Sequence, residues 1–457
     1  MKINKKTFFA VHSWIGIKLS ILFFIVCFSG TLATLSTEMD WLFFPGTRVE
    51  VQDTFAPRNP TVEALRAQYP EGKITLWSRL EVPYASDMVY VNQDGHRTYV
   101  FVNQYTGEIQ GSTNLTFRRF FRDLHYYLFI PFQVGHFTVL TFAFLLLFAL
   151  STALVFYKKW YQKFLELKKG KGAVVLFRSL HRTVGLWSIP FVLLFSITGV
   201  WYFLERTNTG NISRIANTRA PKLEVPIADS VAFASISYTI DYDKAIAAAQ
   251  EVIPGLQVNT ISPPSRNDRA IYLTGTSHVP LVRNRANRVY LHPLTYKVIK
   301  VQRAEETATV TWLNDIADPL HFGFWGGLAT KILWFFGGLA ISGLVLTGIW
   351  ISLKRKVKRD KQKQAQRLGR WKYVNWAFVL LMKFFMYSFL FTRYQASVAT
   401  VIYVTLGWAV VWALAWYVFV YRIRLAVEKE EAKARESALA KAKAREERRA
   451  KVPVSNA

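Results

Sequence analysis

Six long apolar segments constrain this chain more than any other feature of its sequence. A helix needs about 20 apolar residues to cross the hydrocarbon core of a bilayer. Six segments reach or approach that length: 14–36, 132–157, 184–204, 327–353, 374–392 and 397–421. The fifth contains Lys383, a charge that needs a partner or water inside a membrane. The pattern predicts a membrane α-helical bundle of about six spans.

Basic residues cluster at the ends of these segments. The formal net charge is +28, but Lys and Arg beside a span orient it in the membrane, so no nucleic-acid partner is expected. Segment 158–182 carries eight basic residues and one acid, and segment 354–370 carries nine basic residues and one acid. The positive-inside rule therefore predicts a protein of the bacterial inner (plasma) membrane with both segments, the N-terminus and the C-terminus in the cytoplasm.

The two long segments between spans combine mixed charge with a helix-like stretch and period-two alternation, which predicts two α+β domains outside the membrane. The chain is then expected to divide into an N-terminal segment with the first span (1–36), a first periplasmic domain (37–131), spans two and three with a basic cytoplasmic loop (132–204), a second periplasmic domain (205–326), a fourth span (327–353), a basic cytoplasmic loop (354–373), spans five and six (374–421) and a charged cytoplasmic tail (422–457).

The chain has one cysteine, Cys27, which is expected to be a small core residue of the first apolar segment. A single cysteine excludes disulfides within the chain, four-cysteine iron–sulfur sites and CxxCH haem attachment. The first segment follows MKINKK, but it is about 22 residues long and has no A-x-A cleavage site, so a retained span is predicted rather than a signal peptide.

The two halves of the chain repeat the same spacings. Glycines follow His12 at +4 and +18, and glycines follow His181 at the same offsets. A lysine follows His125 at +33, and another follows His321 at +33. The outer segments also match, since each begins with a helix-like stretch and ends with a similar strand pattern. Agreement in three places predicts a tandem duplication of span, outer domain and span, with two spans appended.

Five of the eight histidines stand in or beside the first four predicted spans: His12, His125, His136, His181 and His321. The repeat places His12 and His181 near the cytoplasmic face, and His125 and His321 near the outer face. Two imidazoles make a six-coordinate haem suited to electron transfer, and a helical bundle can hold the porphyrin. The pattern predicts two haem b groups, one for each pair. Structural histidines and zinc or copper ligands are the alternatives, although structural zinc needs four ligands together.

His136 complicates the outer site. It lies 11 residues after His125, about three turns along a continuous helix, and so it is an alternative ligand or a residue that lines the site. Its counterpart in the repeat is Ile332, which favours His125 as the ligand. Gly16 and Gly185 would allow close approach of either a macrocycle or a neighbouring helix.

Three arginines, Arg118, Arg119 and Arg122, shortly precede His125. They are expected either to contact haem propionates or to anchor the chain at the membrane interface. The remaining histidines lie on turn or strand patterns and are expected at the surface, with His292 as a distant candidate for a substrate site.

Four runs of the sequence resemble the spans of a known family. The run 320-LHFGFWGGLATKILWFFGGLAISGLVLTGIW resembles the last conserved span of the PepSY-associated transmembrane family, the iron-regulated membrane proteins. The runs 12-HSWIGIKLSILFFIVCFSG, 124-LHYYLFIPFQVG and 181-HRTVGLWSIPFVLLFSITGVW resemble its other three. The resemblance covers roughly residues 8–355.

This resemblance implies PepSY-like outer domains, an association with ferric-siderophore uptake and, in some members, a di-haem reductase that releases iron by reducing Fe(III). Matched by motif, the family's span histidines fall on four residues: His12, His125, His181 and His321. Val192 departs from the pattern, because many relatives carry a further histidine there. PepSY modules are also linked to peptidase inhibition.

The expected function is therefore reduction of a periplasmic ferric chelate through two bis-histidine haems. The predicted cytoplasmic loops are too short for a flavin or nicotinamide domain, and no G-x-G-x-x-G follows a strand, so electrons would come from quinol or a cytoplasmic reductase. The rival interpretation is a non-catalytic, membrane-anchored PepSY protein that binds a peptide, siderophore or partner protein. A transport permease is less favoured, because the spans lack several intramembrane acids.

Overall fold

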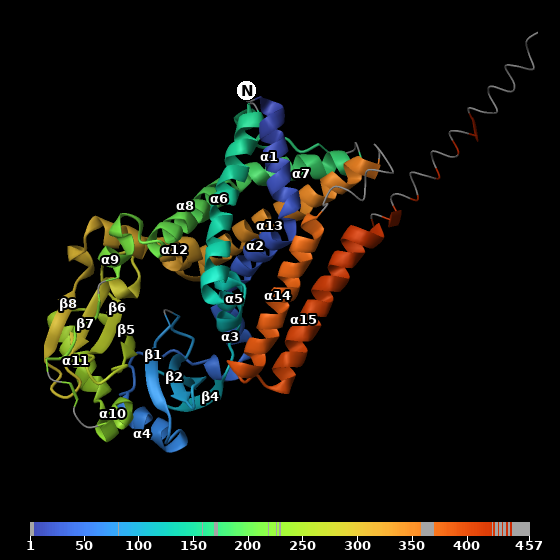
Figure 1. Cartoon of the computed structure of the whole chain (residues 1–457). Coiled ribbons are helices and arrows are strands. Elements are labelled where there is room, and N and C mark those ends of the chain that lie inside the picture. Colours follow the sequence, from blue (N-terminus) through green and yellow to red (C-terminus); the bar gives the residue numbers. More distant parts are fainter. Residues whose placement is uncertain are drawn as a thin grey trace, which may run out of the picture.

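The computed structural model describes residues 4–422 except 81, 158, 169–171, 218, 225, 228–229 and 358–369, together with scattered positions between 424 and 440. Long helices occupy one end of the molecule and the strands occupy the other (Figure 1). Much of the predicted basic loop 354–373 and of the predicted tail 422–457 lies outside the described residues.

Five helices of the described chain are long and apolar enough to cross a membrane: α6 (Phe132–Phe156), α8 (Ile189–Arg206), α13 (Gly327–Val357), α14 (Trp371–Thr392) and α15 (Val398–Trp416). A sixth candidate is the pair α1 (Lys5–Lys18) and α2 (Ser20–Thr34), which is bent by 73°. The predicted first span, 14–36, is therefore a bent pair of helices that begins earlier in the chain.

The predicted third span, 184–204, is divided in a similar way. Helix α7 (Ala173–Trp187) ends inside it, and α8 begins with Pro190 in its first turn. Proline is tolerated at that position because the first N–H groups of a helix have no partner within the helix.

Lys383, the charge inside the fifth apolar segment, lies beside aromatic rings. Its ammonium group is 5.7 Å from the ring centroid of Trp408 and 5.9 Å from that of Trp412, both on α15. Cation–π attraction of this kind strengthens where water is excluded. The partner that this lysine was expected to need is therefore the neighbouring helix.

The strands form one antiparallel sheet of eight in the order β4-β3-β2-β1-β5-β6-β7-β8. Their bounds are β1 (Lys73–Ser78), β2 (Asp87–Gln93), β3 (His96–Val102), β4 (Ile109–Thr113), β5 (Gln257–Ser262), β6 (Ile271–Thr276), β7 (Asn287–Leu291) and β8 (Val298–Gln302). The outer segments 37–131 and 205–326 each contribute four strands. They meet where β1 pairs with β5, at Trp77–Ile261 and Ser78–Thr260.

One face of the sheet is covered by three helices: α4 (Asn59–Gln68), α10 (Ser230–Thr239) and α11 (Tyr242–Val252). The helix-like stretches predicted in the two outer segments are α4 and α11. Their N-termini meet, because the carboxylate of Asp243 accepts hydrogen bonds from the backbone N–H groups of Arg58 (2.8 Å) and Asn59 (3.1 Å). The opposite face of the sheet is turned toward the long helices.

A buried carboxylate holds the start of β2. Asp87 is fully buried and accepts hydrogen bonds from the indole N–H of Trp77 at 2.8 Å and from Arg79 at 3.0 Å. A second buried guanidinium, that of Arg58, lies 3.9 Å away. Removing one member of such a group leaves the others buried without a counter-charge.

We predict that Asp87→Ala destabilises the sheet by about 3–5 kcal/mol, because two guanidinium groups then lose their only neighbouring carboxylate at β2. Thermal unfolding of the detergent-purified protein measures the effect. Asp53→Ala removes an exposed carboxylate and is the matched control. Equal unfolding midpoints for the two variants would contradict this account.

Candidate functional site

Four of the five candidate histidines form two couples. His12 on α1 faces His181 on α7, with ring centroids 6.3 Å apart and ring planes at 83°. His125 on α5 (Phe117–Tyr127) faces His321 on α12 (Thr309–Phe322), also with centroids 6.3 Å apart but with ring planes at 36°. The structure thus brings together the same pairs that the repeat indicates. We call them the N-terminal couple and the sheet-side couple.

One ring of each couple is hydrogen-bonded to a backbone carbonyl. Nδ1 of His12 lies 2.9 Å from the carbonyl oxygen of Ala149, and Nδ1 of His125 lies 2.9 Å from that of Val26. A carbonyl can only accept, so Nδ1 carries the proton in both rings. Their Nε2 atoms therefore hold the lone pair that a metal ion could use.

The other ring of each couple is hydrogen-bonded to a threonine. Nδ1 of His181 lies 2.9 Å from the hydroxyl oxygen of Thr347, and Nδ1 of His321 lies 2.7 Å from that of Thr198. Histidines that bind metals commonly use their second ring nitrogen in this way, which fixes the orientation of the ring.

The spacing of both couples suits axial ligation of one metal ion. Two imidazoles on opposite sides of a metal, with bonds of about 2.0–2.1 Å and about 1.2 Å from each nitrogen to its ring centre, have centroids about 6.3–6.5 Å apart. Both couples have this separation. Among the described residues, no group of three or more His, Cys, Asp or Glu side chains lies together as an ion site. Each couple thus offers two axial nitrogens.

Glycines leave room around the rings. A Cβ at Gly30 would lie 2.7 Å from Cε1 of His125, so only glycine allows α2 to pass beside that ring. A Cβ at Gly16 would meet no described atom within 4 Å, and one at Gly185 would meet only the side chain of Leu344, at 3.8 Å. The open space beside Gly16 suits approach of a macrocycle better than helix packing.

His136 is not on the same helix as His125. The continuous helix assumed from the sequence spacing does not form, because the chain turns at Leu128 and Phe129, both with positive φ, before α6 begins. The His136 ring instead packs 4.1 Å from the ring of Tyr126, and its Nδ1 lies 3.1 Å from the Tyr126 carbonyl oxygen. His136 therefore lies beside the sheet-side couple and belongs to neither couple.

Carboxylates hold both ends of α5, which carries one ring of the sheet-side couple. At its start, Asp40 of α3 (Ser36–Phe43) accepts hydrogen bonds from the backbone N–H groups of Phe117 (2.6 Å) and Arg118 (3.3 Å). In its last turns, the buried Asp123 accepts a hydrogen bond from Arg119 at 2.8 Å. Arg119 is therefore already ion-paired.

A cavity of about 1240 Å³ lies between the sheet and the sheet-side couple. His125, His136 and His321 contribute to its helical wall, and Tyr90 and Tyr99 contribute to its sheet wall. The volume exceeds the roughly 300–1,000 Å³ of most small-molecule sites. The sheet-side couple thus borders a chamber large enough for a bulky ligand.

Positive charge dominates the wall of this cavity. Eight Arg or Lys side chains line it against three Asp or Glu side chains. Arg118, Arg119 and Arg122, the three arginines singled out from the sequence, are among them. A concave surface with an excess of one charge concentrates ligands of the opposite charge, so the chamber favours anions.

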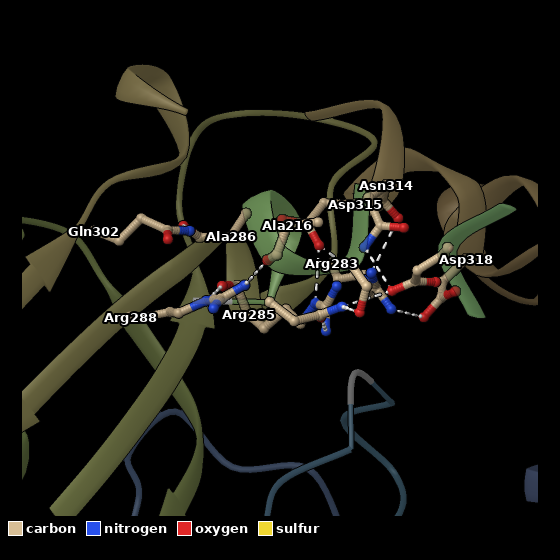
Figure 2. A network of polar contacts seen from close by, with 12 residues as sticks. Ala216, Arg283, Arg285, Ala286, Arg288, Gln302, Asn314, Asp315 and Asp318 are labelled. Carbon is tan, nitrogen blue, oxygen red and sulfur yellow. Dashed lines mark hydrogen bonds and ion pairs between the residues drawn. The ribbon is translucent and has the colours of Figure 1, made fainter. Parts of the chain in front are cut away.

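An ionic network ties the sheet to α12, which carries His321 (Figure 2). Arg283 donates to Asp315 at 2.9 Å and to Asp318 at 2.7 Å, and Arg285 donates to Asp315 at 2.9 Å. Asp315 is fully buried. Since both arginines lie on the connection between β6 and β7, the sheet helps to fix the position of this imidazole.

The sheet-side rings lie outside the five long apolar helices, and both are neutral at ordinary pH. Burial lowers the pKa of His125, and burial together with the neighbouring His125 lowers the pKa of His321 to about 3. Neutral imidazole is the form that binds metal ions.

His292, the distant candidate for a substrate site, has a local role. Its Nδ1 accepts hydrogen bonds from the backbone N–H groups of Leu294 (3.2 Å) and Thr295 (3.3 Å), as in a turn. It does not line the cavity among the described residues.

The model of one protein family, the PepSY-associated TM region, matches residues 9–355, which is most of the sequence. The chain belongs to this family. No curated protein matches the sequence. The family expected from the four sequence runs is thereby confirmed, and the PepSY-associated chain is a membrane protein whose long apolar helices imply a lipid environment. Both imidazole couples lie inside the matched segment, whereas α14 and α15 lie outside it.

Several residues that hold the rings carry weak sequence signals. Gly30 and Thr347 stand out only as marks of the internal repeat, and Thr198 only as the residue before a repeated glycine. The carbonyl groups of Val26 and Ala149 carry no side-chain signal, because every residue has a carbonyl.

Proposed function

We propose that this protein is an inner-membrane, haem-dependent reductase that passes electrons across a bacterial plasma membrane to a ferric chelate (siderophore) in the periplasm. The observation that carries the proposal is the presence of two imidazole couples with centroids 6.3 Å apart. When bound, a haem b in each couple supplies a one-electron carrier. Residues His12 and His181 would hold one haem, and His125 and His321 the other.

The proposed orientation puts the sheet in the periplasm and both chain ends in the cytoplasm. It rests on the basic residues of segments 158–182 and 354–370, which the positive-inside rule assigns to the cytoplasm. The N-terminal couple then lies near the cytoplasmic face, where a quinol or a cytoplasmic reductase would donate electrons. The sheet-side couple lies near the periplasmic chamber.

We further propose that the bundle has six spans and arose with its two PepSY-like domains by tandem duplication. Support comes from the order of the sheet, in which β1 to β4 and β5 to β8 extend outward from a central junction. Further support is that each couple takes one ring from each half of the chain.

The chamber is the proposed site for the acceptor. One electron converts the bound Fe(III) chelate to its Fe(II) form, and hard-oxygen chelators hold Fe(II) far more weakly, so the metal is released. The excess of arginine and lysine along the wall would attract a chelate with negative charge. Arg118 and Arg122 could also contact haem propionates, whereas Arg119 is already paired with Asp123.

A non-catalytic binding protein is the competing function, because the same cationic chamber could capture an anionic ligand without electron transfer. The two functions differ in whether the imidazoles matter. Capture alone would depend on the chamber wall and would be indifferent to the N-terminal couple.

We predict that His12→Ala and His321→Ala each reduce ferric-chelate reduction by about 100-fold or more, because loss of a ligand should exceed the 10–100-fold effects of its supporting residues. Absorbance of a coloured Fe(II) complex measures the rate in proteoliposomes supplied with a quinol or a reductase. His278→Ala, at a largely exposed histidine, is the control. Unchanged rates in all three variants would favour the binding protein.

We predict that Gly30→Ala removes haem from the sheet-side couple only, because the new methyl group would displace the ring of His125. Haem content per chain should fall from two to one. Gly407→Ala on α15 adds a methyl group where no described atom lies within 4 Å, so this control should keep both haems. Two haems in both variants would show that His125 is not a ligand.

A further inference from the structure

Two threonine hydroxyls contact the imidazole couples, one in each. Thr198 on α8 contacts His321 at 2.7 Å, and Thr347 on α13 contacts His181 at 2.9 Å. Both threonines come from the second half of the chain. The first-half rings, by contrast, contact backbone carbonyls. Every couple therefore has one carbonyl-bound ring and one hydroxyl-bound ring.

The single hydrogen of each hydroxyl is already used within its own helix. Thr198 donates to the carbonyl oxygen of Leu194 at 2.7 Å, and Thr347 donates to that of Gly343 at 2.8 Å. Two oxygens at this distance repel each other unless a hydrogen lies between them. The hydroxyl oxygen can therefore only accept from the imidazole, so the imidazole nitrogen must be the donor.

We infer that Thr198 and Thr347 are positioning residues that hold His321 and His181 as the Nδ1–H tautomer, with Nε2 directed to iron. This inference rests on the proposed function, since it assigns the role of the threonines toward the haem ligands. With the carbonyl-bound rings, it makes all four histidines the same tautomer. It also makes the two ligands of each haem unequal, because a carbonyl and a hydroxyl polarise N–H to different extents.

The internal repeat explains which half carries the hydroxyl. Ser29 stands 17 residues after His12, as Thr198 stands 17 residues after His181. Ser29 Oγ lies 3.4 Å from Nδ1 of His125, whereas the Val26 carbonyl oxygen lies 2.9 Å from the same atom. The shorter contact has replaced the hydroxyl in the first half.

The inference is tested with Thr198→Val and Thr347→Val, which keep the shape of the side chain and remove only the hydroxyl. Haem retention at the affected couple should weaken by about 10–100-fold, as when other outer partners of metal ligands are removed. The midpoint potential of the haem that remains bound should rise, because an imidazole without an acceptor at Nδ1 donates less charge to Fe(III). Redox titration of the visible spectrum measures the potential.

The two haems can be distinguished by electron paramagnetic resonance, whose anisotropy depends on the angle between ligand planes, here 83° and 36°. Thr198→Val should change only the sheet-side signal, and Thr347→Val only the other. Thr198→Ser and Thr347→Ser retain the hydroxyl and should restore the wild-type potentials. Thr141→Val is the matched control, since Thr141 bonds only to the carbonyl of Phe137 on its own helix.

Wild-type potentials and haem content in the valine variants would overturn the inference while leaving the reductase intact. Failure of the serine variants to restore a potential that valine had changed would also overturn it. Wild-type protein that binds no haem would instead reject the proposed function.

Discussion

Packing between the two halves of the chain sets the separation of the imidazoles on which the site depends. His12 and His125 belong to the first half, and His181 and His321 to the second, yet each couple combines one ring from each. Neither couple can form unless the halves pack together. In a membrane, that packing relies on close contact and polar bonds rather than on the hydrophobic effect.

Orientation of the rings is set differently from their separation. Each imidazole hydrogen-bonds to an acceptor from its own half, either the carbonyls of Val26 and Ala149 or the hydroxyls of Thr198 and Thr347. Local bonds thus fix the direction of each ring, and packing between halves fixes the distance across the couple. This division lets two similar sites form from one repeated design.

The eight-stranded sheet couples the chamber to the helices. Its central junction of β1 and β5 is another contact between the two halves, and the Arg283–Asp315 contact links its β6–β7 connection to α12. A ligand that enters the chamber therefore meets a wall connected to a candidate haem ligand. The excess of cationic side chains on this wall is consistent with capture of an anionic chelate before electron transfer.

Repeat spacing and apolar length predicted much of this arrangement, because residues at equivalent positions of a repeat occupy equivalent places. They indicated which histidines meet and where most long helices lie. They could not predict the turn at Leu128 and Phe129, since two bulky residues with positive φ give no local signal. The bend between α1 and α2 and the joining of β1 to β5 depend on tertiary contacts. The separation of His136 from His125 follows from that unpredicted turn.

The most direct test of the account is a reduced-minus-oxidised optical spectrum of detergent-purified protein, with haem counted per chain and with iron and haem supplied during expression. Two b-type haems per chain, both with the spectrum of six-coordinate bis-imidazole iron, are predicted. Protein without a Soret band under these conditions would contradict the central claim that the two histidine couples bind haem.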